Sequence, residues 1–371
     1  MIIKKIKSNY KLLIILFILI IISLLSIYSA EGLLIDNSFF LKQVIWYLLG
    51  LIFIIFMLYI GNKVLYHYAF YLYIIGNILL LLLLIFGTPI NDAKCWFVIP
   101  FIGSFQPSEF MKIVLIIYLA KVIDKFNTDY HNPSIQDEFK FLMKVILIVG
   151  IPSVLTFLEP DTGVVLIYLI ITITMLFISG IRIRWFILLF SIILILLGII
   201  LGTYFFHQNL FIKIFGTDFF LRVDRLLDWS NKSGFQLENG LTAIGSGGLI
   251  GHGFNNTPIY FPEPQTDFIF AVFASNFGFI GGSILLIILL LFDLELVKTA
   301  FKVKDIEKYI IAGTLGMLIY QQFQNIGMTL GILPITGITL PFISYGGSSL
   351  LSYMLIIAII LNMDKKKLHW M

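Results

Sequence analysis

The chain has 371 residues, of which 59% are hydrophobic and only 12% are charged. A typical soluble domain is about half apolar and about a quarter charged, so this composition excludes an ordinary water-soluble protein and indicates a membrane protein. The net charge of +4 does not indicate a nucleic-acid partner, because the basic residues lie between apolar runs rather than on one exposed face. A single cysteine, Cys95, excludes an intramolecular disulfide and a thiol-rich metal cluster.

Apolar segments long enough to cross a membrane recur along the chain. A spanning helix needs about 20 largely apolar residues, and the first run, after the basic start MIIKKIKSNYK, is long enough to be a helix rather than a cleaved signal peptide. The sequence therefore predicts one all-α, polytopic membrane domain over residues 1–371, with about ten transmembrane helices. These helices are expected near residues 12–30, 43–60, 66–86, 108–123, 141–157, 163–180, 185–206, 268–292, 308–331 and 347–363.

Lysine and arginine positions predict the orientation of the helices. Basic residues are retained on the cytoplasmic side, and most of them fall there if both termini are cytoplasmic, which agrees with an even number of helices. One long extracytoplasmic loop, about residues 207–266, then joins the seventh and eighth helices. The polar segments 87–112, 158–163 and 331–349 lie on the same outer side, so we expect the functional chemistry there.

The stretch QPSEFMK places two opposite charges at the start of a predicted helix. Pro107 is expected to open this helix, with Gln106 or Ser108 as its cap. Glu109 and Lys112 are three residues apart and share one helical face. They form either a local ion pair that neutralises both groups in lipid or part of a functional site, and the two interpretations are compatible.

Two further acidic segments lie at predicted helix boundaries. In LEPDTG, Glu159 and Asp161 occupy either a simple interfacial turn or a site that binds substrate or a metal ion. In YFPEPQTDFIF, Thr266 or Asp267 suits the N-cap of the following helix. The alternative for Asp267 is a general base, since a carboxylate at a membrane boundary can have a raised pKa.

The glycine cluster IGSGGLIGHGF, residues 244–254, lacks the lysine of a phosphate-binding P-loop. Its glycines either approach a phosphate or allow close packing of a re-entrant segment. His252 has no second histidine at ligand spacing and is expected to be structural. SYGGSS, residues 344–349, is either a closely packed helix start or backbone that faces a substrate. No hydrolase or metalloprotease motif is present.

Five stretches occur in order between about residues 92 and 362: FQPSEFMKI, EPDTG, AIGSGGLIGHGF, PEPQTDFIFAV and LPITGITLPFISYGGSSLL. Together they resemble the SEDS family, which includes RodA, FtsW and SpoVE, and RodA most of all. The resemblance implies a peptidoglycan glycosyltransferase of the bacterial cytoplasmic membrane, with its active site facing outside. Its substrates would be lipid II and the nascent glycan strand, and its partners a class B penicillin-binding protein, other elongation or division proteins and membrane lipid.

The same resemblance implies roles for individual residues. The catalytic residue would be Asp267, and the substrate-binding residues would be Glu109, Lys112, Asp161 and Arg225. The chain has DAKCW where the family commonly has a second basic residue, so Cys95 departs from the pattern and Lys94 is expected to cover the role in diphosphate binding. A divalent cation, Mg²⁺ or Mn²⁺, is a possible cofactor held by Glu109 or Asp161.

Two other functions are weighed against the glycosyltransferase. A lipid II flippase would require charges accessible from both faces, whereas the acids gather on the outer side. A non-catalytic scaffold for a penicillin-binding transpeptidase would not require Asp267 in a polar cavity. The sequence does not separate a role in elongation from one in division or sporulation.

Overall fold

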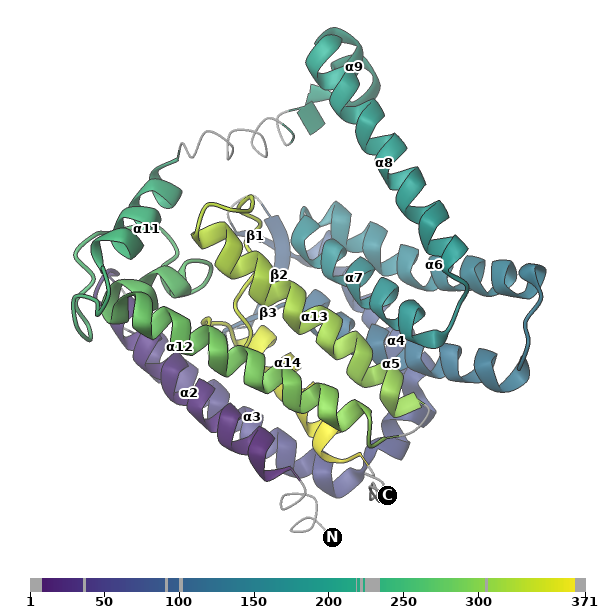
Figure 1. Cartoon of the computed structure of the whole chain (residues 1–371), viewed down its shortest axis with the longest axis horizontal. Helices are drawn as coiled ribbons and strands as arrows, with labels where there is room; N and C mark the ends of the chain where they lie inside the picture. The colour runs from purple at the N-terminus through teal and green to yellow at the C-terminus, as the bar shows by residue number, and fades with distance from the viewer. Residues whose placement is uncertain are drawn as a thin grey trace.

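A computed structural model describes residues 9–35, 38–90, 93–99, 103–217, 219–220, 223, 234–303 and 306–363. Figure 1 shows that these residues form a bundle of helices with one small sheet. Seven helices, α2, α3, α4, α6, α7, α8 and α12, are long and apolar enough to cross a membrane. The prediction of an all-α polytopic membrane protein is confirmed.

Each of the ten predicted segments coincides with a helix. Their bounds are α2 (Tyr10–Glu31), α3 (Phe39–Ile60), α4 (Asn62–Phe86), α5 (Pro107–Asp129), α6 (Ile135–Leu158), α7 (Thr162–Ser179), α8 (Ile183–Phe206), α12 (Ile269–Ala300), α13 (Ile306–Thr329) and α14 (Gly347–Leu361). The helices α5 and α13 carry more polar residues than the seven apolar ones, and α14 is shorter.

The centre of the bundle is built around α14 and α13. The helix α14 packs against α3 and α5, while α13 packs against α7, α12 and α5. Almost every residue of α14 from Ser349 onward is buried, so apolar and polar side chains alike must find partners within the protein. By contrast, α8 extends away from the bundle (Figure 1), and its buried residues are Phe186 and Tyr204.

The two ends of the described chain meet at one end of the bundle (Figure 1). Asn9 Nδ2 donates to the carbonyl of Leu361 at 3.4 Å, and Asn362 Nδ2 donates to the carbonyl of Met57 at 3.1 Å. The first contact joins the start of α2 to the end of α14 and the second joins the residue after α14 to α3, so both ends of the described chain lie at the same end of the bundle.

A three-stranded antiparallel sheet connects α4 to α5, and the all-helical prediction did not include it. Its strands are β1 (Thr88–Ile90), β2 (Ala93–Ile99) and β3 (Gly103–Phe105), in the order β1-β2-β3. Thr88 pairs with Trp96, and Phe97 pairs with Phe105. The aromatic and β-branched residues of β2 favour a strand over a helix.

Within the predicted long loop, about 207–266, the described residues form two short helices, α9 (Gln208–Phe215) and α11 (Phe235–Ser246). The glycine cluster follows α11 and packs against α12. Four backbone hydrogen bonds join residues 248–253 to residues 275–280, where α12 is broken at Gly278. A Cβ on Gly251 would lie 2.2 Å from the carbonyl oxygen of Asn276, so the structure favours close packing over a phosphate cradle.

Candidate active site

A cavity of about 1140 Å³ lies at the end of the bundle opposite the termini. Its walls come from the start of α3, the sheet, the starts of α5 and α7, the turn before α12, and the segment between α13 and α14. Four carboxylates from three separate parts of the chain line it: Glu109, Asp161, Glu263 and Asp267. The structure therefore brings together three of the predicted site residues, Glu109, Asp161 and Asp267.

The wall formed by α5 contains a buried ion pair. Lys112 Nζ lies 2.7 Å from Glu109 Oε2, and the Lys112 side chain is 0% exposed. The same ammonium group lies 5.3 Å from the centroid of the Tyr353 ring on α14. Lys112 is therefore placed behind the cavity wall and acts on the cavity through Glu109.

Tyr353 continues this polar chain to the opposite wall. Its hydroxyl accepts a hydrogen bond from Gln321 Nε2 of α13 at 2.7 Å, and Gln321 itself lines the cavity. The Glu109–Lys112 ion pair, the Tyr353 ring and the Gln321 amide thus connect α5, α14 and α13 beside the cavity. A connected buried network fixes the positions of its members, because each polar group would be costly without its partner.

Asp161 begins α7 and uses both carboxylate oxygens. Oδ1 accepts a hydrogen bond from the backbone N–H of Val164 at 3.1 Å, which makes Asp161 the N-cap of the helix, and Oδ2 accepts one from Gln106 Nε2 at 2.9 Å. Burial, together with the charge of Glu109, raises the pKa of Asp161 to about 6. A carboxylate in this state is available to a cationic ligand at neutral pH.

Glu159 and Cys95 pack behind Asp161. Glu159 is fully buried, and its two carboxyl oxygens have no hydrogen-bond partner among the described residues. Burial and the charge of Asp161 raise the pKa of Glu159 to about 8, so this carboxyl is mostly protonated at pH 7. The Cys95 thiol donates to the Glu159 carbonyl at 3.0 Å, and burial raises its pKa well above the usual range.

Asp267 lies in a turn that precedes α12. Glu263 O accepts hydrogen bonds from the backbone N–H groups of Thr266 and Phe268, and Glu263 Oε2 accepts one from Thr266 Oγ1 at 2.9 Å. The helix begins at Ile269 with Phe268 as its N-cap and has no side-chain cap hydrogen bond. The predicted capping by Thr266 or Asp267 is therefore wrong, because the turn delays the helix start and leaves the carboxylate facing the cavity.

The backbone around Asp267 is held from the C-terminal part of the chain. Asn325 Nδ2 donates to the Asp267 carbonyl at 2.9 Å, Ser344 Oγ donates to the Thr266 carbonyl at 2.6 Å, and Tyr345 N–H donates to the Gln265 carbonyl at 2.8 Å. These three donors fix the turn without using the carboxylate. Burial, together with the negative charge of Glu263, raises the pKa of Asp267 to about 7.

Two glycines shape the cavity wall. Gly337 has φ +68°, a backbone conformation that favours glycine, and a Cβ on it would lie in ordinary contact with Asp267 Oδ2, at 3.6 Å. In SYGGSS, a Cβ on Gly347 would lie 2.4 Å from the Trp46 ring, while Ser348 and Ser349 line the cavity. This segment thus combines both predicted roles, since it packs closely at the start of α14 and also faces the cavity.

The helix start at Pro107 differs from the prediction. Neither Gln106 nor Ser108 caps it: Gln106 is at the N-cap position without a side-chain cap hydrogen bond, and its amide binds Asp161 instead. Pro107 does open the helix as predicted. Gln106 therefore joins the starts of α5 and α7 across the cavity wall.

Two predicted basic residues, Lys112 and Lys94, do not line the cavity. Lys94 is exposed on β2, whereas its neighbours Cys95 and Trp96 line the cavity. Arg225 lies outside the described residues. The structure adds Lys42, in the first turn of α3, which lines the cavity and was not singled out from the sequence. In the sequence, the only sign that Lys42 belongs to the site is its position at the start of an apolar helix.

Comparison with known proteins gives the family. A family model described as "Cell cycle protein", FTSW_RODA_SPOVE, matches residues 6–369. The chain belongs to the SEDS family. Among its SEDS relatives, the probable peptidoglycan glycosyltransferase FtsW of Coxiella burnetii is 34% identical, over 93% of this chain and 92% of the relative. The stage V sporulation protein E of Bacillus subtilis is 32% identical, over 98% of each.

Solved structures agree with this SEDS membership. A chain from a peptidoglycan synthase complex that coordinates polymerization and crosslinking has a TM-score of 0.78 and 25% identity, with 95% of this chain and 96% of that chain covered. The rod shape determining protein RodA of Thermus thermophilus has a TM-score of 0.68 and 26% identity, with coverages of 95% and 94%. The names FtsW, SpoVE and RodA thus all occur among relatives of this SEDS protein.

The buried Glu109–Lys112 ion pair of this SEDS protein is expected to contribute to the free energy of unfolding. Replacing Lys112 by Met leaves a buried carboxylate without its counter-charge and should cost about 3–5 kcal/mol, as should Glu109→Gln for the ammonium group. The double variant Glu109→Gln/Lys112→Met should lose less than the sum of the two single losses. Thermal unfolding of the four proteins in one detergent measures the coupling.

An exposed pair provides the matched control. Lys298 and Glu295 have the same spacing and the same 2.7 Å separation, but the Lys298 side chain is 59% exposed. Lys298→Met should therefore change stability by no more than about 1 kcal/mol. Equal effects of Lys112→Met and Lys298→Met would contradict a structural role for the buried pair.

Proposed function

We propose that this chain is a peptidoglycan glycosyltransferase that polymerises lipid II into glycan strands. The observation that carries the proposal is the Asp267 carboxylate, which faces a cavity of about 1140 Å³ and has a pKa of about 7. A general base is most effective when its pKa lies near the working pH. The names of the FtsW relatives support the same activity.

The reaction joins two sugars and releases a lipid diphosphate. Asp267 accepts the proton from the 4-hydroxyl of the acceptor N-acetylglucosamine as that oxygen attacks C1 of the donor N-acetylmuramic acid. The new C1–O bond forms while the bond from C1 to the diphosphate oxygen breaks, and its electron pair leaves with undecaprenyl diphosphate. Attack on the face opposite the leaving group inverts the configuration at C1.

The other predicted site residues, together with Lys42, are assigned to binding and positioning. Glu109 and Asp161 are proposed to contact the substrate, with Lys112 holding Glu109 in place by the 2.7 Å ion pair. Lys42 is a cation on the cavity wall that suits the diphosphate. Lys94 and Arg225 are proposed to reach the diphosphate from the sheet and from the long connection between α8 and α12.

A divalent cation is proposed to assist diphosphate binding. Four carboxylates line the cavity, so a diphosphate would meet strong repulsion without added positive charge. Among the described residues, no group of three or more His, Cys, Asp or Glu could hold a metal ion by itself. Mg²⁺ is commonly bound by one or two carboxylates together with substrate phosphates, and Asp161, with Glu109, fits that mode. When bound, the cation would neutralise the diphosphate.

The setting and the partner are also proposals. The distribution of basic residues supports cytoplasmic termini, so the cavity at the opposite end of the bundle would open outside the bacterial cytoplasmic membrane. A related chain belongs to a synthase complex that couples polymerization to crosslinking. We therefore expect a class B penicillin-binding protein as the transpeptidase partner, with other elongation or division proteins.

Loss of the proposed base tests the function. Asp267→Asn keeps the size of the side chain but removes its basicity, so polymerisation of lipid II should fall by about 10²–10⁴-fold. The measurement uses purified protein in liposomes and scores glycan polymer and transbilayer movement of lipid II separately. Glu238→Gln, an exposed acid on α11 away from the cavity, is the matched control.

The outcomes separate the three functions. Lipid movement without polymer by the unchanged protein would favour a flippase, and neither activity would favour a scaffold. Polymer formation at the normal rate by folded Asp267→Asn would contradict the catalytic assignment.

The raised pKa of Asp267 predicts the pH dependence. The base acts when deprotonated, so the polymerisation rate should rise with pH through about 7 and then level off. Glu263→Gln removes the negative charge that contributes to the raised pKa, and the rise should move to lower pH. Initial rates between pH 5 and 9 for both proteins provide the measurement. A rise near pH 4, or one that Glu263→Gln leaves in place, would argue against this base.

Cation removal tests the proposed cofactor. Chelation by EDTA should abolish polymerisation, and Mg²⁺ or Mn²⁺ should restore it, because the acidic cavity repels the diphosphate without a cation. Asp161→Asn should raise the Mg²⁺ concentration needed for half-maximal rate by about tenfold or more. Full activity after exhaustive chelation would show that the lysines alone suffice.

A further inference from the structure

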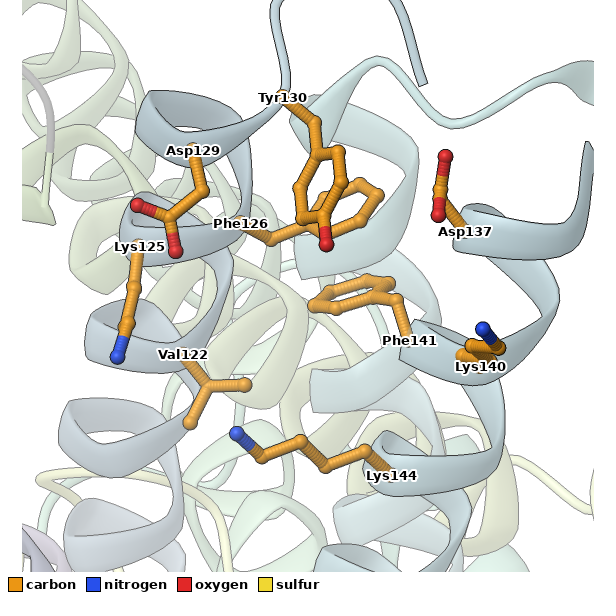
Figure 2. Close-up of a pocket in the computed structure, with 9 residues that line it drawn as sticks. All are labelled: Val122, Lys125, Phe126, Asp129, Tyr130, Asp137, Lys140, Phe141 and Lys144. Atoms are coloured by element: carbon orange, nitrogen blue, oxygen red, sulfur yellow. The ribbon is translucent and has the colours of Figure 1, made fainter. Parts of the chain in front are cut away.

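A second, smaller cavity lies at the other end of α5. It has a volume of about 220 Å³ and is formed by the last two turns of α5 and the first turns of α6. Figure 2 shows the residues that line it: Val122, Lys125, Phe126, Asp129, Tyr130, Asp137, Lys140, Phe141 and Lys144. Lys125 follows Glu109 by 16 residues, or about 24 Å of helix, so this pocket is distinct from the large cavity.

The pocket lies at the end of the bundle that also holds the chain termini. Lys121 Nζ donates to the carbonyl of Tyr66 in the second turn of α4 at 2.9 Å, and Asn62 Nδ2 donates to the carbonyl of Ile359 near the end of α14 at 2.8 Å. These contacts connect the lower part of α5 to the end of α14. By the distribution of basic residues, this is the cytoplasmic end.

Aromatic rings form the floor of the pocket. The rings of Phe126 and Phe141 stack with centroids 4.1 Å apart, and the Tyr130 ring lies 5.3 Å from that of Phe126. Both phenylalanines are buried. Because the stacked rings hold α5 against α6, the pocket has its shape before any ligand binds.

Three lysines surround this floor. Lys125 comes from α5, while Lys140 and Lys144 are four residues apart on α6 and share one face of it. In Figure 2, the Lys144 side chain extends from α6 toward Val122 on α5. None of the three ammonium groups forms an ion pair with a carboxylate of the described residues.

The charged side chains next to the pocket form contacts within the protein. Arg182 and Arg184 both contact the buried Glu138 carboxylate, and Asp137 Oδ2 accepts hydrogen bonds from the backbone and the hydroxyl of Ser134 in a capping box. Asp129 is exposed at the pocket rim. The pocket is thus lined by three lysines and two carboxylates, Asp129 and Asp137, and carries a net positive charge.

The lysine side chains of the pocket are within reach of the lipid headgroups. Lys140 and Lys144 lie about 8 and 14 Å along α6 from its first residue, so their backbones lie inside the end of a hydrocarbon core that is a few ångströms shorter than the helix. Lysine side chains reach toward the interface from such positions. On the same part of α6, Met143, Ile146 and Leu147 expose apolar side chains that suit acyl chains.

We propose that this pocket binds the phosphodiester headgroup of an anionic phospholipid. Lys125, Lys140 and Lys144 would donate to the phosphate oxygens, and Asp129 would accept from a headgroup hydroxyl such as those of phosphatidylglycerol. Basic pockets between membrane helices on the cytoplasmic side are suited to such headgroups. This inference does not depend on the activity proposed for the large cavity.

Lipid titration tests the proposal. The purified full chain in a neutral detergent is titrated with short-chain phosphatidylglycerol, short-chain phosphatidylcholine and inorganic phosphate, and retained lipid is counted by native mass spectrometry. Thermal stability is followed in parallel. Phosphatidylglycerol should bind and raise the melting temperature, whereas phosphatidylcholine and inorganic phosphate should do neither at the same concentrations.

Two triple variants locate the site. Lys125→Gln/Lys140→Gln/Lys144→Gln should weaken phosphatidylglycerol binding by about tenfold or more. Lys63→Gln/Lys302→Gln/Lys308→Gln removes the same charge at the same end of the bundle, away from the pocket, and should leave binding unchanged.

Three outcomes would overturn the proposal. Equal losses in the two triple variants would mean a diffuse charge effect, and equal binding of inorganic phosphate would mean a soluble-anion site. Unchanged binding in the pocket variant, with its melting temperature retained, would place the lipid elsewhere and leave the lysines to another class of partner, such as an acidic protein.

Discussion

Burial of charge inside a bundle surrounded by hydrocarbon is the constraint on which the cavity depends. Lys112 has no access to water and is held by Glu109 at 2.7 Å and by the face of Tyr353. An ammonium group in this position is costly unless both contacts are kept, so α5 and α14 cannot move apart freely. The wall that presents Glu109 to the cavity is therefore stiff, which suits the alignment of two substrates that the proposed reaction requires.

The helices could be predicted from hydropathy because lipid requires long apolar runs with internally satisfied backbones. Features that depend on tertiary contacts could not. The small sheet pairs residues such as Phe97 and Phe105 above the cavity, and the break at Gly278 is stabilised by residues 248–253. In the sequence, the sheet region mixes polar, apolar and turn-forming residues, and the region around Gly278 is a run of apolar residues and glycines; each pattern fits several local structures.

The acids of the cavity were recognisable because carboxylates near membrane boundaries need a reason to be there. Glu109, Asp161 and Asp267 could be placed on one side of the membrane by charge distribution alone. For Lys42 the sequence offered only its position at the start of an apolar helix, and Gln321 could not be added, since its helix meets the others only after folding. The capping role expected for Asp267 failed for a related reason: the turn from Glu263 to Phe268 is set by donors distant in the chain.

Those donors determine when the site can exist during synthesis. The carbonyls of Asp267 and Thr266 are bound by Asn325 and Ser344, which follow them by 58 and 78 residues. The membrane helices before them can insert and pack while the turn still lacks these hydrogen bonds. A chain interrupted before residue 344 would thus lack the hydrogen bond from Ser344 that helps to hold the turn containing Asp267. Because Ser344 lies late in the chain, the turn that contains Asp267 is fully held only after residue 344 has been synthesised.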